Sequence, residues 1–202
     1  MKKYITEFIG TFFLVIGTIF GGAIGASLAL MGMVYAGGHL SGAHYNPAVT
    51  FAIWMRGRLE KKYILGYCIF QLLGAAAAGF LASAFFKETG GGSCGIPLEA
   101  TSAGIIAELV GTFALVFVVL NVATATGTSG NSFYGLAIAG TVLAMATALG
   151  KFSGGVFNPA VYAGLFLQKS VCGDQCWMYL AGEFGGAVLA VIVFSFCNPD
   201  DK

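Results

Sequence analysis

Long apolar stretches alternate with short polar connections along the whole chain. A helix needs roughly 20 apolar residues, with a range of about 17–25, to cross the hydrocarbon core of a membrane. Six stretches have this length: 4–20, 22–38, 63–86, 103–123, 133–150 and 176–197. The pattern therefore predicts an all-α membrane protein with six transmembrane helices.

Two shorter apolar pieces, Pro47–Met55 and Pro159–Leu167, interrupt this series. Each follows an asparagine, in the tetrapeptides Asn46–Val49 and Asn158–Val161, which both read Asn-Pro-Ala-Val. Asparagine is a favoured helix N-cap, and proline is tolerated best at the first helical position. Roughly ten residues make about 15 Å of helix, which is half the hydrocarbon thickness. We therefore expect two re-entrant half-helices.

A helix that begins inside a membrane exposes backbone N–H groups, which is costly unless that backbone serves a cavity. Two such beginnings in one chain favour a pore whose centre lies between them. The side-chain oxygen of each asparagine can cap its own helix, which leaves the NH2 group for the lumen. The predicted pore-centre residues are Asn46, Pro47, Ala48, Asn158, Pro159 and Ala160.

The two halves of the chain repeat each other beyond the tetrapeptides. Glu7–Val15 matches Glu108–Val116 at an offset of 101, and Gln71–Gly74 matches Glu183–Gly186 at the tetrapeptides' offset of 112. We expect a single channel domain, residues 1–202, built from repeats of about 1–90 and about 99–202. Because each repeat has three full spans, the second is inverted, and inverted repeats bring interrupted helices together near the midplane.

Composition agrees with a membrane location. Of the 202 residues, 57% are hydrophobic and 9% are charged, whereas soluble domains carry about 25% charged residues. The net charge of +1 and the lack of a basic tract give no reason to expect nucleic acid as a partner. The lipid bilayer is the expected surrounding.

Lysine and arginine set the expected orientation, because they favour the cytoplasmic side of a membrane. With the N-terminus inside, seven of these residues lie inside and three outside. We therefore expect a multi-pass protein of the cell membrane (plasma or inner) with both termini cytoplasmic. The inside set is Lys2, Lys3, Arg56, Arg58, Lys61, Lys62 and Lys202, and the outside set is Lys87, Lys151 and Lys169.

The twin Asn-Pro-Ala, a Glu-x-x-Gly-Thr-Phe near the start of each half, and His39–Gly42 before the first Asn-Pro-Ala resemble the aquaporin (major intrinsic protein) family. The resemblance covers essentially the whole chain. It implies a right-handed six-helix bundle with two re-entrant half-helices, one pore per subunit and a homotetramer. It also implies that Asn46 and Asn158 donate hydrogen bonds to water or solute in a single-file pore.

Two acids and two histidines are candidate supports of the re-entrant loops. Glu7 and Glu108 interrupt apolar helices, so their side chains should face protein and not lipid. By resemblance they hold the loop backbone, and a proton relay is the alternative. We expect His39 and His44 to bond to loop backbone, with pore lining or pH gating of the cytoplasmic mouth as the alternative, because histidine titrates near neutrality.

The chain departs from the family at the outer constriction. The family places Arg after the second Asn-Pro-Ala, where this chain has Val161, and the other constriction positions fall at Ala26, Ala146 and Gly155. Water-selective members have a large aromatic, His and a small residue there. We therefore expect a wide, apolar constriction with weaker exclusion by size. Lys151 is a candidate substitute cation, although a solvated lysine is the simpler expectation.

Losing the Arg also changes the charge along the path. Two half-helix dipoles supply roughly +0.5 each at the midplane, and the family's Arg would add about one more charge. The barrier to cations should then rest mainly on the asparagine-capped centre, together with the cost of dehydrating an ion in an apolar passage.

Cys94, Cys172 and Cys176 fall on the expected outer side. A disulfide between Cys94 and either of the other two is one expectation if that compartment is oxidising. Closure of Cys172 on Cys176, free thiols, or a soft metal at the mouth are the alternatives. The sequence has no Cys and His set of zinc spacing elsewhere, so no metal or cofactor is predicted.

The first functional hypothesis is a passive channel for water and small uncharged solutes such as glycerol, urea, ammonia or metalloid acids. The missing Arg and the two buried acids motivate a second, an ion- or proton-coupled transporter. The third is a structural membrane protein with an occluded pore. An enzyme lacks support, because no nucleophile and base set, phosphate loop or metal cluster appears.

Overall fold

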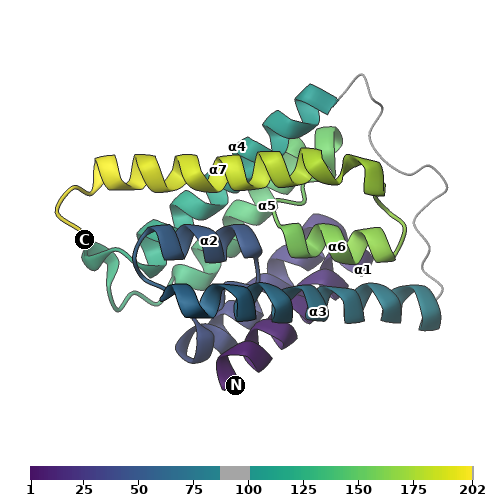
Figure 1. Ribbon diagram of the computed structural model, residues 1–202, viewed down its shortest axis with the longest axis horizontal. Coiled ribbons are helices and arrows are strands. Elements are labelled where there is room, and N and C mark those ends of the chain that lie inside the picture. The colour runs from purple at the N-terminus through teal and green to yellow at the C-terminus, as the bar shows by residue number, and fades with distance from the viewer. Residues whose placement is uncertain (87–100, 202) are drawn as a thin grey trace.

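The computed structural model describes residues 1–86 and 101–201, and those residues form an all-helical bundle (Figure 1). The predicted fold class is confirmed. Both half-helices begin and end at the predicted residues, because a capping asparagine and a proline define each start locally. The α-helices are α1 (Lys2–Ser41), α2 (Pro47–Met55), α3 (Lys61–Phe85), α4 (Thr101–Ala123), α5 (Tyr134–Ser153), α6 (Pro159–Leu167) and α7 (Cys176–Cys197).

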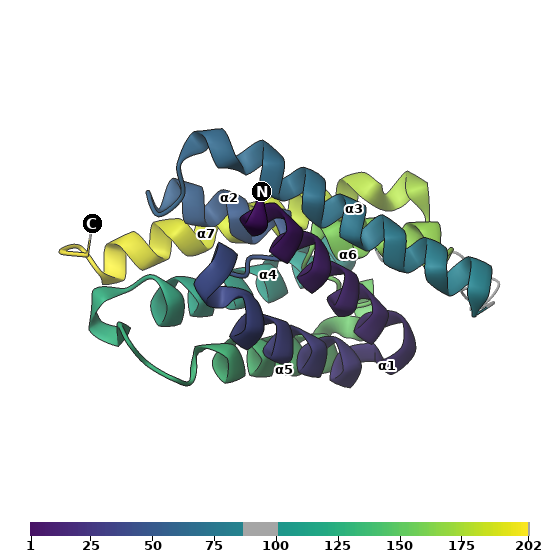
Figure 2. The same ribbon diagram turned by 90° about the horizontal axis from the view of Figure 1, so that it is seen from below.

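Helix α1 contains the first two predicted spans and reverses direction at Gly22. Gly22 has φ 55° and ψ −144°, a conformation that suits glycine because it has no Cβ. A methyl group on Gly17 would lie 2.5 Å from the carbonyl oxygen of Gly25, so the two limbs pack backbone against backbone. Figure 2 shows the limbs folding back on each other. Five long apolar helices therefore supply six crossings in the described part of the chain.

Glycines set the spacing between the long helices. A methyl group on Gly74 of α3 would lie 2.3 Å from the carbonyl oxygen of Phe8 in α1. The equivalent position in the second half, Gly186 of α7, is 2.3 Å from the carbonyl oxygen of Leu109 in α4 by the same measure. Small residues are what allow membrane helices to approach this closely.

The half-helices tie the two halves of the chain together. Helix α2 packs against α7 as well as α3, and α6 packs mainly against α3. A methyl group on Gly79 of α3 would lie 2.4 Å from the carbonyl oxygen of Gly164 in α6, which shows how tight that contact is. Each half-helix is therefore held by a long helix from the opposite half.

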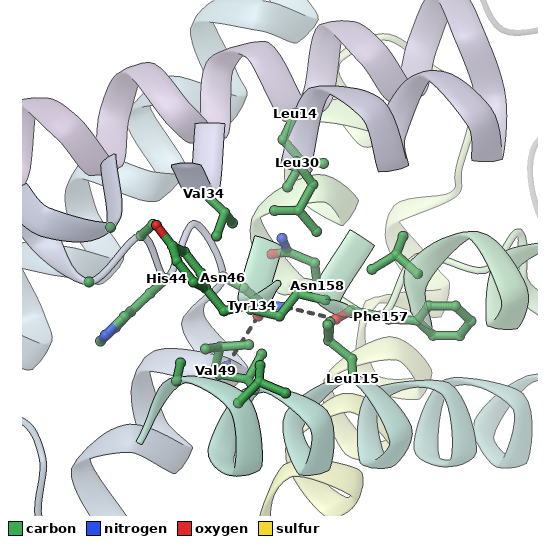
Figure 3. Close-up of a pocket in the computed structure, with 18 of the residues that line it drawn as sticks. Leu14, Leu30, Val34, His44, Asn46, Val49, Leu115, Tyr134, Phe157 and Asn158 are labelled. Carbon is green, nitrogen blue, oxygen red and sulfur yellow. Dashed lines mark hydrogen bonds between the residues drawn. The ribbon is translucent and has the colours of Figure 1, made fainter. Parts of the chain in front are cut away.

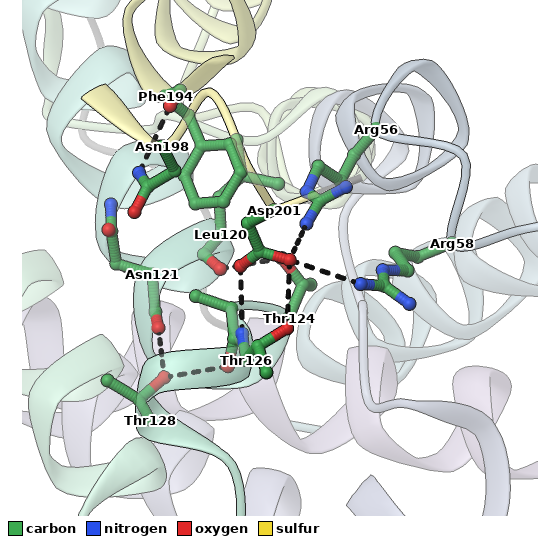
Figure 4. A network of polar contacts seen from close by, with 11 residues as sticks. Arg56, Arg58, Leu120, Asn121, Thr124, Thr126, Thr128, Phe194, Asn198 and Asp201 are labelled. Carbon is green, nitrogen blue, oxygen red and sulfur yellow. Dashed lines mark hydrogen bonds and ion pairs between the residues drawn. The ribbon is translucent and has the colours of Figure 1, made fainter. Parts of the chain in front are cut away.

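The C-terminus lies at one end of the bundle, here called the terminal end, and the turn of α1 lies toward the opposite end, here called the kink end (Figures 1 and 2). Asp201 ties three segments together at the terminal end (Figure 4). Its carboxylate accepts hydrogen bonds from Arg56 at 2.7 Å, from Arg58 at 3.3 Å and from the backbone N–H of Thr126 at 2.8 Å. The guanidinium of Arg56 also lies 4.8 Å from the ring centroid of Phe194.

Asp201 generates a pH-dependent prediction. The Thr126 backbone N–H, followed by the Thr126 hydroxyl and Arg56, lowers the pKa of Asp201 below its ordinary value. A carboxylate with a lowered pKa stabilises the fold above its unfolded pKa and loses that effect as the pH falls through the folded value. The melting temperature of Asp201→Asn should therefore lie below that of the wild type by a constant amount between about pH 5 and 8, and the gap should close at more acid pH.

The measurement is thermal unfolding in detergent, monitored by tryptophan fluorescence, both between about pH 5 and 8 and at more acid pH. Asp200→Asn is the matched control, because Asp200 is exposed and adjacent in sequence, and it should melt with the wild type. A gap for Asp201→Asn that persists undiminished at the most acid pH would contradict the assignment.

Candidate functional site

The two loops that precede the half-helices have the same backbone path. Helices α1 and α5 each end at a serine, followed by a left-handed glycine, Gly42 with φ 89° and Gly154 with φ 86°. The residue before each capping asparagine is also left-handed, Tyr45 with φ 51° and Phe157 with φ 52°. These turns bring each asparagine back into the middle of the bundle before its half-helix begins.

Asn46 and Asn158 cap their own helices and also bond across to the opposite loop. The Oδ1 atom of Asn46 accepts from the backbone N–H of Ala48 at 2.8 Å, and that of Asn158 from Ala160 at 2.9 Å. Their Nδ2 atoms donate to the carbonyl oxygens of Phe157 and Tyr45, both at 2.9 Å. One N–H of each amide is used in this way, which leaves the second as a donor toward the space between the loops.

That space is a cavity of about 1030 Å³, and both asparagines line it. Figure 3 shows them near its middle, among apolar side chains from several elements. The lining extends from Gly22 at the kink end to Lys3 and Arg58 at the terminal end. Labelled apolar residues around the asparagines include Leu14, Leu30 and Val34 of α1, Val49 of α2 and Leu115 of α4.

All four positions predicted for the constriction line this cavity: Ala26, Ala146, Gly155 and Val161. Gly155 has φ 67°, and a methyl group there would lie 2.9 Å from the Cα of Ala146. The structure therefore brings two of the four into contact. None of the four carries a polar side chain, so only backbone groups can offer hydrogen bonds at these positions.

Glu7 and Glu108 are buried behind the loops and are not among the residues that line the cavity. Glu7 accepts from the backbone N–H groups of His44 at 3.0 Å and Tyr45 at 2.7 Å. Glu108 accepts from the equivalent groups of Val156 at 3.0 Å and Phe157 at 2.6 Å. Each acid thus holds two consecutive N–H groups immediately before a capping asparagine.

The two histidines occupy different places. His44 is buried, and its Nδ1 lies 3.1 Å from the hydroxyl of Thr50, a side-chain partner where we expected loop backbone. His39 is exposed at the end of α1. Both belong to the cavity lining, on its terminal side.

Several residues that hold the loops were missed in the sequence. Tyr67 and Tyr179 donate to the carbonyl oxygens of Ser41 at 2.5 Å and Ser153 at 2.7 Å, which are the last residues of α1 and α5. Glu183 also accepts from the backbone N–H of Asn158 at 2.7 Å. The signal was present, because Tyr67 and Tyr179 are separated by the same 112 positions as the asparagines.

Comparisons with known proteins agree with this geometry. Residues 17–194 match the sequence profile of a family described as major intrinsic protein. The chain belongs to the major intrinsic protein family. It is 34% identical over 199 residues to aquaporin AqpM of Methanothermobacter marburgensis, which covers 92% of this chain and 77% of that protein. It is 35% identical over 220 residues to aquaporin NIP1-1 of Zea mays, which covers 100% and 77%.

The fold is also similar to the X-ray structure of the aquaglyceroporin from Plasmodium falciparum. The TM-score is 0.74 at 21% identity, over 98% of this chain and 97% of that one. Membership of the major intrinsic protein family makes the chain a membrane channel and not an enzyme.

At Val161, one of the four positions predicted for the constriction, the chain places no cation in the cavity. Lys151, the candidate substitute, is exposed, and its Nζ lies 4.9 Å from the ring centroid of Phe152. It is not among the described residues that line the cavity. The described part of the lining therefore carries its basic side chains, Lys3 and Arg58, only at the terminal end.

The cysteines at the kink end are in different states. Cys172 is disulfide-bonded, whereas Cys176 is a free thiol, so Cys172 does not close on Cys176. Cys94 lies outside the described residues. Of the two cysteines expected as alternatives for a disulfide, Cys172 forms one and Cys176 does not.

The packing behind the second loop yields a stability prediction. A methyl group on Gly111 of α4 would lie 2.1 Å from the Phe157 ring, which leaves no room for a side chain. Gly111→Ala should destabilise the protein by about 1–3 kcal/mol, because overpacking forces the ring and its loop to move. Gly140→Ala in α5 is the matched control, since no atom lies within 4 Å of the methyl group it would add.

Thermal unfolding of both variants in detergent checks this prediction. The control should unfold at or slightly above the wild-type temperature, because alanine is favoured over glycine in a helix by roughly 1 kcal/mol. Equal stability of the two variants would show that the ring does not depend on Gly111.

Proposed function

We propose that this chain is a passive channel for water and small uncharged solutes, with a wide, apolar outer constriction. The observation that carries the proposal is the cavity, which has donors at its centre and neutral, small side chains at all four constriction positions. The solutes with the right chemistry are water, glycerol, urea, ammonia and uncharged metalloid acids. The names of similar proteins, aquaporins and an aquaglyceroporin, support water and glycerol among them.

The continuity of the cavity favours conduction over an occluded, purely structural role. Its lining runs from Gly22 and Ala23 at the kink end, past both asparagines, to Ser129 and Gly130 at the terminal end. A volume of about 1030 Å³ is ample for a file of water molecules, since each occupies roughly 30 Å³ in the liquid.

The positions of the acids favour a passive pore over a coupled transporter. A relay needs acids that face the pathway, but the described lining contains no acidic side chain. Glu7 and Glu108 instead each accept two backbone N–H groups behind the loops. A carboxylate that accepts several such bonds is a structural support and has no open route to the lumen.

Exclusion of cations rests on the centre and the terminal mouth. The N-termini of α2 and α6 meet at the asparagines, and each contributes roughly +0.5 charge there. Lys3 and Arg58 add positive charge at the terminal end. The apolar constriction adds a dehydration cost for any ion, because it has no polar side chain to replace water.

We propose that Asn46 and Asn158 form the pore centre, with the following Pro-Ala pairs setting their geometry, and that the protein acts as a homotetramer. We also propose that it lies in the cell membrane with the terminal end cytoplasmic. In the described chain, that orientation corresponds to Lys2, Lys3, Arg56, Arg58, Lys61 and Lys62 inside, and to Lys151 and Lys169 outside. This distribution follows the positive-inside tendency.

Stopped-flow light scattering on proteoliposomes tests the proposal directly. We expect osmotic water permeability well above that of empty liposomes, together with uptake of glycerol, urea and ammonia. Flux that rises in proportion to the solute gradient is expected of a pore, and a current driven by a proton gradient would favour the coupled transporter. Permeability equal to that of empty liposomes would favour the occluded alternative.

The constriction is tested by Val161→Arg. A buried arginine at this position narrows the passage and adds a positive charge, so glycerol and urea flux should fall by about tenfold, which corresponds to roughly 1.4 kcal/mol of barrier. Water flux should fall much less, because water is the smallest of these solutes. Val161→Leu is the matched control, since it adds bulk without charge, and it should have the smaller effect on solute flux. Unchanged solute selectivity in Val161→Arg would remove Val161 from the constriction.

A further inference from the structure

Glu183 of α7 is a third buried acid, which lies behind the second loop at the position that corresponds in the repeat to Gln71. Its side chain is 0% exposed. Its Oε1 accepts the backbone N–H of Asn158 at 2.7 Å, whereas Oε2 has no hydrogen-bond partner among the described residues. A carboxyl group inside a membrane bundle is costly, so its presence points to a specific task.

The equivalent residue in the first half, Gln71, acts in the opposite sense. Gln71 donates its Nε2 to Glu7 at 2.8 Å and to the hydroxyl of Thr50 at 2.9 Å. Glu183 accepts from the loop backbone instead. As a result, three consecutive backbone N–H groups donate to acids. Those of Val156 and Phe157 donate to Glu108, and that of Asn158 donates to Glu183.

The hydrogen bond between Glu183 and the Asn158 backbone involves a residue that itself lines the cavity. The Asn158 backbone that Glu183 holds carries the amide whose Nδ2 donates to the carbonyl oxygen of Tyr45 at 2.9 Å. The N–H of Tyr45 in turn donates to Glu7 at 2.7 Å. A chain of hydrogen bonds therefore runs from α7 through the lumen-lining Asn158 and the opposite loop to α1.

We propose that Glu183 is a positioning residue for the pore centre, which fixes the Asn158 amide by accepting its backbone N–H. The inference rests on the proposed channel function and adds to it a residue that determines selectivity. What matters is the acceptor oxygen, so a neutral amide oxygen at the same place should serve. Loss of the acceptor should free the Asn158 backbone and with it the donor that orders the single file.

The test compares three variants in proteoliposomes, with water permeability and proton leak measured per folded protein. Glu183→Gln keeps an acceptor oxygen and should match the wild type within about twofold in both. Glu183→Leu removes the acceptor, and we expect water permeability to fall about fivefold and the ratio of proton leak to water flux to rise about fivefold. Glu183→Met, which is unbranched and adaptable, replaces the leucine variant if that one does not fold.

Tyr162→Phe is the matched control. It removes a partly buried hydrogen bond, from the Tyr162 hydroxyl to the carbonyl oxygen of Cys172 at 2.6 Å. It keeps the backbone N–H of Tyr162, which donates to the carbonyl oxygen of Asn158 at 3.0 Å. It should lower thermal stability and leave the leak ratio unchanged, which separates positioning from general stabilisation.

Two outcomes overturn the proposal. A wild-type leak ratio in Glu183→Leu would show that Asn158 does not depend on the acceptor, and a Glu183→Gln variant as impaired as Glu183→Leu would show that the charge is required. If the wild-type protein conducts water and either of these results is found, only the role of Glu183 is overturned. If the water flux of the wild type equals that of empty liposomes, the channel function is overturned as well.

Discussion

Two helices begin in the middle of a membrane bundle, and their backbone N–H groups must be satisfied where no bulk water reaches. The chain meets this demand with side chains from the long helices. Glu7 and Glu108 take the N–H groups just before each capping asparagine, and the asparagine oxygens take those just after it. Each remaining feature of the centre follows from holding these two loops in place.

The glycines and tyrosines around the loops serve the same constraint. Gly10 and Gly111 leave room for the rings of Tyr45 and Phe157, which fill the space behind each loop. Tyr67 and Tyr179 hold the carbonyl end of the preceding helix. Because Glu7 and Glu108 lie behind the loops and do not line the cavity, the asparagine amides remain as polar donors near its middle.

The two halves have the same residue at one position of the cavity lining, but they differ in the residues behind the loops. Val49 and Val161 both line the cavity, so the residue after each Asn-Pro-Ala is the same in the two halves. Behind the loops the halves diverge, because Gln71 donates to an acid while Glu183 accepts from Asn158. Three consecutive backbone N–H groups of the second loop therefore donate to acids, against two in the first loop.

The sequence by itself determined the spans and the two half-helices. Hydrophobic length defines a span, and an Asn-Pro start defines a helix within a few residues, so Pro47–Met55 and Pro159–Leu167 could be predicted without knowing the fold. Only the tertiary structure decided which groups the buried polar atoms meet. Glu108 reaches Phe157 across 49 positions, and Asp201 reaches Arg56 across 145, and no local pattern encodes such partners because they depend on how all the helices pack.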